Sequence, residues 1–170
     1  MRAIRFASQL NFNVDESIMI AAKDMKERLS IVSQERITDE FLKILATNKP
    51  SIGLKLLFDS TVLEIVFPEI SIMAGVDQRK DYHHKDVFLH TLQVVDNICR
   101  ETDNVWLRFA ALVHDIAKPP TKKFVEGIGW TFHGHEDLGA RMMKKIFHRM
   151  KLPLHQLEYI QKLVRLHLRP

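Results

Sequence analysis

The stretch "FAALVHDIAKPPTKK", residues 109–123, places a histidine beside an aspartate in a run that is apolar up to its prolines. Residues 104–117 repeat apolar side chains at spacings of three and four, which predicts a helix whose buried face includes His114. An ionised carboxylate without a partner is costly to bury, and the nearest cation to Asp115 in this stretch is Lys118, one turn on. The stretch therefore predicts a buried polar pair that needs further partners.

Most of the remaining chain also has the periodicity of amphipathic helices. The predicted helical segments are 1–10, 15–32, 38–47, 52–67, 86–101, 104–117, 135–150 and 155–167. Segments 15–32 and 38–47 begin with an Asp and a Thr suited to capping, Asp86 is the expected cap of a third helix, and Pro68 stops segment 52–67, which holds one or two helices. The glycines of residues 122–134, "KKFVEGIGWTFHG", instead predict a small hairpin or ordered loop. The predicted fold class is an all-α, multi-helix bundle.

Composition excludes several classes of protein. The 170 residues are 46% hydrophobic, which excludes disorder, and the single Cys99 excludes an internal disulfide framework. No apolar run approaches the roughly 20 residues of a membrane span, so we expect a cytoplasmic protein with no membrane partner. Lys and Arg balance Asp and Glu at eleven each through residue 80, so the net charge of +4 lies beyond it and permits weak attraction to phosphate.

Histidine divides the chain into two compositional halves, because all nine histidines lie between His83 and His167. The polar segment "GVDQRKDY", Gly75–Tyr82, lacks helical periodicity and is the expected join. We therefore predict three parts: a helical region over 1–74, a linker over 75–82 and a second domain over 83–170.

Four of the histidines lie on the apolar faces of four different predicted helices. They are His90, His114, His135 and His167. The other five fall in loops, at helix ends or in register with charged residues, and are expected at the surface: His83, His84, His133, His148 and His155. The sequence thus predicts that four helices each direct one histidine towards the core.

A metal site is one explanation of this pattern, and a hydrogen-bonded structural cluster is the other. A single histidine on an apolar face is usually a satisfied core side chain, but four of them and Asp115 would all be satisfied by one shared ion. Imidazole and carboxylate ligands suit Zn, Mn, Fe, Co or Ni, and the sequence does not choose among them or exclude Mg.

The order His90, then His114-Asp115, then His135 within "FHGHEDLGA", together with "HDIAKP", resembles the HD superfamily of metal-dependent phosphohydrolases, which are helical bundles. The resemblance implies that His90, His114 and Asp115 bind the metal and that His135 and His167 are further ligands or phosphate contacts. It also implies that Lys118 faces the phosphate, although a solvated helix end is the alternative for this side chain.

The resemblance further implies a catalytic group made of Asp115, Lys118 and His135. In the family another aspartate comes from a later helix, which would lie beyond "LHLRP" at the end of this sequence. Asp137 is a poor substitute because it stands two residues past His135 and so faces elsewhere.

The first half resembles the neck and RNA-binding region of bacterial tRNA nucleotidyltransferases and poly(A) polymerases, on "MRAIRFASQLNFNVDESIMIAAKDM" and "ERITDEFLKIL". Many of those enzymes carry an HD domain directly afterwards. The resemblance implies tRNA as a partner, with two pairs of candidate RNA-binding residues for which a solvated basic edge is the alternative: Arg2 and Arg5, and Lys122 and Lys123.

The nucleotidyltransferase core is not recognised in this sequence, which has no Gly-Gly or Gly-Ser phosphate loop and no Asp-x-Asp pair for Mg²⁺. We therefore expect a fragment that adds no nucleotides by itself. Two functions follow from the resemblance. One is an accessory portion whose HD domain hydrolyses phosphomonoesters or 2',3'-cyclic phosphates, with a cyclic nucleotide as a candidate ligand. The other is a non-catalytic helical scaffold that positions RNA.

Overall fold

A computed structural model describes residues 1–77 and 86–169. The N-terminal half contains the helices α1 (Arg2–Leu10), α2 (Glu16–Asp24), α3 (Gln34–Leu45), α4 (Pro50–Asp59), α5 (Leu63–Val66) and α6 (Pro68–Ser71), with a 3-10 helix at Lys26–Ile31. The C-terminal half contains α7 (Val87–Ile98), α8 (Val105–Val113), α9 (Lys118–Thr121), α10 (His135–Arg149) and α11 (Leu157–Leu166), with a 3-10 helix at Leu154–Gln156. Its only strands within the described residues are β1 (Lys123–Val125) and β2 (Gly129–Thr131). The predicted all-α class is confirmed.

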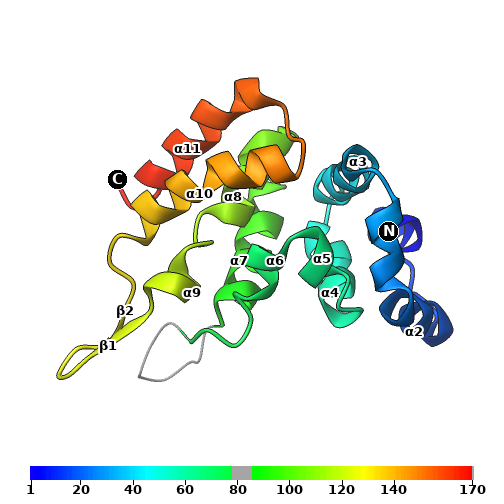
Figure 1. The fold of residues 1–170 in the computed structure, drawn as a ribbon, viewed down its shortest axis with the longest axis horizontal. Coiled ribbons are helices and arrows are strands. Elements are labelled where there is room, and N and C mark those ends of the chain that lie inside the picture. Colours follow the sequence, from blue (N-terminus) through cyan, green and yellow to red (C-terminus); the bar gives the residue numbers. More distant parts are fainter. Residues whose placement is uncertain (78–85, 170) are drawn as a thin grey trace.

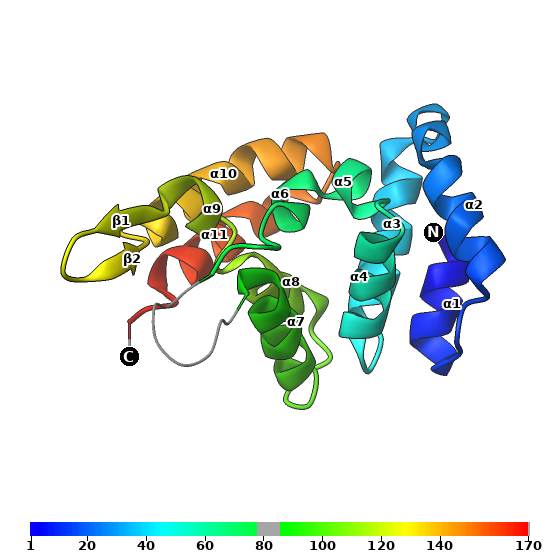
Figure 2. The same cartoon turned by 90° about the horizontal axis from the view of Figure 1, so that it is seen from below.

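Figures 1 and 2 show α1 and α2 at one end of the molecule and the β1–β2 hairpin at the other. The helices between them share one continuous apolar core, in which Phe41 and Phe67 of the first half pack with Phe109 and Phe147 of the second. None of the helices in the described ranges has the length and apolar composition needed to cross a membrane. The predicted small hairpin is confirmed, with Phe124 paired to Trp130 in an antiparallel register.

Polar contacts also join the two halves. Arg108 on α8 is buried and donates hydrogen bonds to two backbone carbonyls: that of Leu45, the last residue of α3, and that of Thr47, two residues later. The Asp96 carboxylate on α7 accepts hydrogen bonds from the backbone and hydroxyl of Ser51, at the start of α4. The two parts predicted as separate domains thus pack together, and the boundary at 75–82 stays a prediction because part of that segment lies outside the described residues.

Several predicted helix limits are wrong in the first half. The segment 15–32 is not one helix, because α2 ends at Asp24 and a 3-10 helix follows; α2 buries no side chain, so packing does not hold the segment in one continuous helix. The segment 52–67 forms two helices, one of the two outcomes predicted, and they are separated where Thr61 takes a positive φ of 56°. The second helix ends just before Pro68, and Pro68 itself begins α6. Proline suits the first position of a helix, because the N–H that it lacks would have no hydrogen-bond partner in the helix.

Two further predictions concern helix starts. The segment 38–47 begins four residues earlier than predicted, at Gln34, and Thr38 is not a cap: its buried hydroxyl donates to the carbonyl of Met150 at the end of α10. Asp86 caps α7 as predicted, since its carboxylate accepts a hydrogen bond of 2.9 Å from the Leu89 backbone N–H.

The helix predicted over 104–117 ends at Val113, so His114 is its C-cap and Asp115 lies in the turn that follows. After Val113 the chain turns more tightly, because the N–H groups of Ile116 and Lys118 bond carbonyls three residues earlier. Pro119 and Pro120 then have no N–H with which a continuous helix could go on. The turn is what directs the His114-Asp115 pair towards the other helices.

Candidate metal centre

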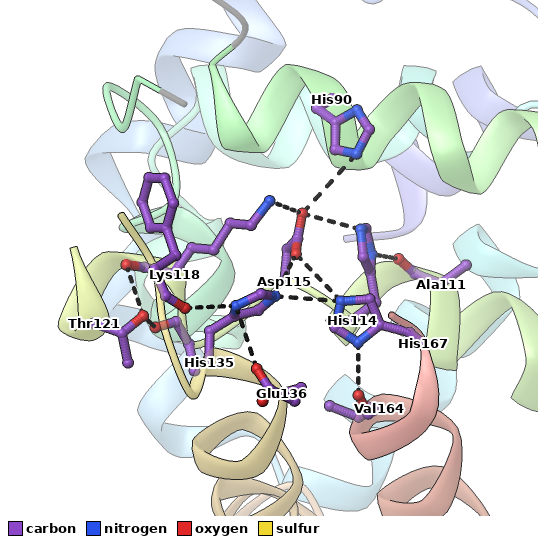
Figure 3. A network of polar contacts seen from close by, with 12 residues as sticks. His90, Ala111, His114, Asp115, Lys118, Thr121, His135, Glu136, Val164 and His167 are labelled. Carbon is purple, nitrogen blue, oxygen red and sulfur yellow. Dashed lines mark hydrogen bonds and ion pairs between the residues drawn. The ribbon is translucent and has the colours of Figure 1, made fainter. Parts of the chain in front are cut away.

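Four histidines converge on the buried carboxylate of Asp115 (Figure 3). His90 lies within α7, His114 is the C-cap of α8, His135 is the first residue of α10, and His167 is the C-cap of α11. The structure therefore brings together all five residues that the sequence analysis proposed as metal ligands.

The two carboxylate oxygens of Asp115 face different partners. Oδ2 lies 3.0 Å from His114 Nε2, 3.9 Å from His90 Nε2 and 2.8 Å from Lys118 Nζ. Oδ1 lies 3.3 Å from His135 Nε2 and 3.7 Å from His167 Nε2. Although Oδ2 is buried and close to nitrogens, it accepts no hydrogen bond of normal geometry from the part of the chain that the structure describes. A buried oxygen of this kind is the expected position for a cation.

The other ring nitrogen of three histidines is bonded to a backbone carbonyl three residues earlier. His114 Nδ1 lies 2.7 Å from the Ala111 carbonyl, His135 Nδ1 lies 2.7 Å from the Phe132 carbonyl, and His167 Nδ1 lies 2.6 Å from the Val164 carbonyl. A carbonyl only accepts hydrogen bonds, so each Nδ1 carries the proton, and in a neutral ring each Nε2 presents a lone pair. This is the arrangement in which histidines usually bind metals.

The electrostatics of the cluster keep Asp115 ionised. Burial alone would raise the pKa of Asp115, but the close imidazole nitrogens of His114, His135 and His167 outweigh burial and hold that pKa far below its usual range. For His167, burial lowers the pKa, whereas the hydrogen bond with Asp115 raises it, and the net result is a raised pKa. Without a metal, a proton on His167 therefore stabilises the carboxylate.

The donor set fits a divalent metal. Two groups have ligand atoms within 4.8 Å of one another, and both include Asp115: one with His90 and His114, the other with His135 and His167. His114 and His167 also cap the C-terminal ends of their helices, where the helix dipole favours a positive charge. Imidazole donors suit Mn, Fe, Co, Ni and Zn, whereas Mg prefers oxygen ligands and fits least well.

Lys118 is not a solvated helix end. Its side chain is largely buried, its ammonium lies 2.8 Å from Asp115 Oδ2, and it lies over the ring of Phe132 at 5.6 Å from the centroid. Lys118 and His135 both line a groove at the surface of the cluster, whose other lining residues are Trp130, Thr131, Phe132, His133, Gly134, Glu136 and Leu168. The groove connects the cluster with the solvent on the side of the hairpin.

The candidate RNA-binding residues lie at opposite ends of the molecule (Figure 1). Arg2 is exposed, with its Nε 3.9 Å from Glu40, whereas Arg5 is mostly buried and donates a hydrogen bond of 2.9 Å to Glu40. Lys122 lies over the Trp130 ring, 4.4 Å from its centroid, and Lys123 is exposed on β1. Arg5 is therefore the least accessible of the four.

The expected surface histidines are placed as follows. His133, His148 and His155 are exposed, as predicted, and His83 and His84 lie outside the described residues. The sequence analysis did not identify the three backbone carbonyls that fix the ring orientations. Each stands three residues before its histidine, but that spacing has meaning only once the local turn is known.

Comparison with known proteins agrees with this architecture. Residues 87–170 match the HD domain family, and residues 11–73 match the family described as "Probable RNA and SrmB-binding site of polymerase A". The multifunctional CCA protein of Vibrio campbellii is 35% identical over 160 residues, which are 90% of this chain and 38% of that protein. The A-adding tRNA nucleotidyltransferase of Deinococcus radiodurans is 31% identical over 175 residues, which are 98% of this chain and 40% of that protein.

The fold and the cluster thus agree with an HD-like second half that follows a helical segment similar to the polymerase A family. Over most of its length the chain is similar to multifunctional CCA proteins and A-adding tRNA nucleotidyltransferases. It spans about two fifths of the length of the curated relatives it matches.

Proposed function

We propose that the C-terminal half is a metal-dependent phosphohydrolase and that the N-terminal helices bind RNA. The observation that carries the hydrolase proposal is the convergence of four histidine Nε2 atoms on the buried carboxylate of Asp115, with three of the rings oriented by carbonyl acceptors. A cluster that served only to fill the core would have no need for several lone-pair donors aimed at one anion.

The residues that would hold the metal are His90, His114, Asp115, His135 and His167, in the two groups that share Asp115. Mn, Fe, Co, Ni and Zn are the candidates, with Mg the least suited. When bound, such an ion lowers the pKa of a coordinated water and neutralises charge on a phosphate oxygen.

Lys118 and His135 supply the remaining chemistry, because both line the groove beside Asp115. The Lys118 ammonium holds a phosphate oxygen that enters the groove. With the metal held by His90, His114 and Asp115, His135 would donate from Nε2 only in its doubly protonated form, because its Nδ1 proton is bonded to the Phe132 carbonyl. During hydrolysis a water oxygen bonds to phosphorus and gives one proton to the solvent, the bond from phosphorus to the leaving oxygen breaks, and His135 protonates that oxygen.

The RNA proposal rests on the match to the polymerase A segment and on relatives whose names concern CCA and tRNA. Arg2 at one end of the molecule and Lys122 and Lys123 at the other are the side chains we propose to contact phosphates. In a full-length protein similar to these relatives, the chain would support tRNA 3'-end processing in the cytoplasm.

Hydrolysis by the purified protein tests the proposal. The protein is loaded with Mn, Co, Ni or Zn and assayed on 2',3'-cyclic AMP and on a phosphomonoester, with metal content measured on the same samples. We expect His114→Ala and Asp115→Asn each to lose both the bound metal and the activity. The control His148→Ala, which changes an exposed histidine, should retain both. Equal metal content in all variants with no hydrolysis by any would instead support the non-catalytic RNA scaffold.

A further inference from the structure

The β1–β2 hairpin contributes little side-chain surface to the core, although Gly129 and Thr131 of β2 are buried. Its strands are three residues long, and all three residues of β1 are exposed. A short two-stranded hairpin is at best marginally stable alone. Yet this one carries two large aromatic side chains at the surface, with Phe124 52% and Trp130 40% exposed. An exposed aromatic pair on a small projecting element commonly marks a binding surface.

The hairpin leads directly into the candidate metal centre. Trp130 and Phe132 line the same groove as Lys118 and His135, and Phe132 also supplies the carbonyl that orients His135. Each of the two aromatic rings has a lysine over it: Lys122 lies 4.4 Å from the Trp130 centroid, and Lys118 lies 5.6 Å from the Phe132 centroid. Aromatic faces and ammonium groups therefore alternate outward from the cluster.

This alternation matches the chemistry of a nucleotide, which joins a flat base to an anionic phosphate. Bases stack on aromatic side chains, while ammonium groups attract phosphate oxygens. A plain phosphomonoester would use Lys118 and the metal ligands but would leave the aromatic wall of the groove without a partner. Among the residues that the structure describes, Glu136 is the one acidic side chain that lines the groove, and its carboxylate lies 3.6 Å from His135 Nδ1.

We propose that Trp130 and Phe132 form a nucleobase subsite, so that a nucleotide stacks its base on the hairpin while its phosphate lies at Lys118 and His135. This inference rests on the proposed hydrolase function and names the residues that would hold the base of its substrate. The nucleotide is either a free mononucleotide or the 3'-terminal residue of an RNA, since both offer a base next to a phosphate ester.

The competing explanation is that the aromatic pair only stabilises the hairpin. Phe124 and Trp130 are directly opposed, with ring centroids 5.2 Å apart at an interplanar angle of 74°, and such cross-strand pairs stabilise hairpins. The two residues differ in one respect that a test can use, because Trp130 lines the groove and Phe124 does not. Substituting each in turn separates stacking from hairpin stability.

The test measures nucleotide binding through the change in Trp130 fluorescence. The protein carries Trp106→Phe, so that Trp130 is its only tryptophan. We expect AMP to quench the signal and ribose 5-phosphate, which has no base, to bind about 5- to 30-fold more weakly. Calorimetry then compares Trp130→Val with the matched control Phe124→Val. Trp130→Val should lower AMP affinity by a similar factor without changing ribose 5-phosphate binding, while Phe124→Val should change AMP binding less than 2-fold.

Equal losses in the two variants, or equal binding of AMP and ribose 5-phosphate, would overturn the subsite. The same titrations are repeated with 2',3'-cyclic AMP and with a short RNA that ends in a 2',3'-cyclic phosphate. The ligand whose affinity Trp130→Val reduces more is the one whose base occupies the subsite, which distinguishes a free mononucleotide from an RNA end. Binding needs no turnover. AMP binding that depends on Trp130, without hydrolysis of any ester, would therefore reject the hydrolase proposal and leave the subsite standing.

Discussion

Helices α2 and α8 are both nine residues long and both have a capping side chain at the start, but they have opposite roles in the fold. Asp15 caps α2 and Asn104 caps α8, yet α2 buries none of its residues and α8 buries six. In α8 the six buried residues hold the chain in place up to Val113 and so position His114. In α2 only the half-buried Ala22 packs against the core, and the helix is followed by a 3-10 helix. Local sequence starts a helix, whereas burial decides how far it continues.

The largest effect is expected at the end of α8, from Asp115→Asn. The substitution keeps the shape of the side chain but removes the charge that the imidazoles and Lys118 surround, so we expect a loss of about 3 kcal/mol in the free energy of unfolding. Affinity for Mn or Ni should fall at least 100-fold. Urea denaturation and metal titration measure the two effects.

Asp137→Asn is the matched control for that change. Asp137 is exposed and forms a surface ion pair of 3.0 Å with Arg165, so its loss should change stability by less than about 1 kcal/mol. It should leave metal affinity unchanged, because Asp137 is not part of the cluster. If both variants lost metal equally, the cluster would not be the binding site.

Arg108→Met tests the packing of α8 against the first half. The guanidinium donates to the carbonyls of Leu45, Thr47 and Thr102, and a methionine would leave these groups without their donor. We expect a loss of about 2 to 4 kcal/mol in the free energy of unfolding. Arg28→Met, at an exposed position in the 3-10 helix, should have little effect. A loss for Arg108→Met below about 1 kcal/mol would show that this link between the halves is dispensable.

The pH dependence of stability should change sign when metal is bound. Because the pKa of His167 is raised on folding, its protonated form stabilises the metal-free protein at low pH, and that contribution is lost as the pH rises through the folded pKa. Metal binding requires the deprotonated ring and so strengthens as the pH rises. The difference in Tm between metal-loaded and metal-free protein should therefore be larger at pH 8 than at pH 6. A difference that shrinks as the pH rises would argue against histidine ligation.

The sequence predicted those features that depend on local pattern. The cap at Asp86, the hairpin and the inward faces of four histidine-bearing helices all follow from spacing along the chain. Spacing could not show that Asp115 lies beyond the end of α8, since that depends on how the prolines after Lys118 reshape the turn.

What lay beyond prediction depends on contacts distant in sequence. Periodicity places His135 and His167 on buried faces, but only tertiary packing sets their Nε2 atoms 3.3 Å apart and both near the same oxygen of Asp115. Arg108 is the clearest case. The sequence of an apolar helix with one arginine does not predict whether the guanidinium reaches the solvent or is buried. In this protein the Arg108 guanidinium is buried and bonds carbonyls at and just after the end of α3.

The smallest effect is expected from Ile20→Ser on α2. Ile20 is 55% exposed although it belongs to the apolar pattern that led to the longer helix prediction. Removing it should change the free energy of unfolding by no more than about 0.5 kcal/mol, because little apolar surface returns to water. Leu112→Ala on α8, where the side chain is fully buried, should lose about 2 to 5 kcal/mol under the same conditions. Thermal and urea unfolding of the pair measure the contrast directly. If Ile20→Ser destabilised the protein as much as Leu112→Ala, α2 would be packed in solution, and the contrast between the two helices would fail.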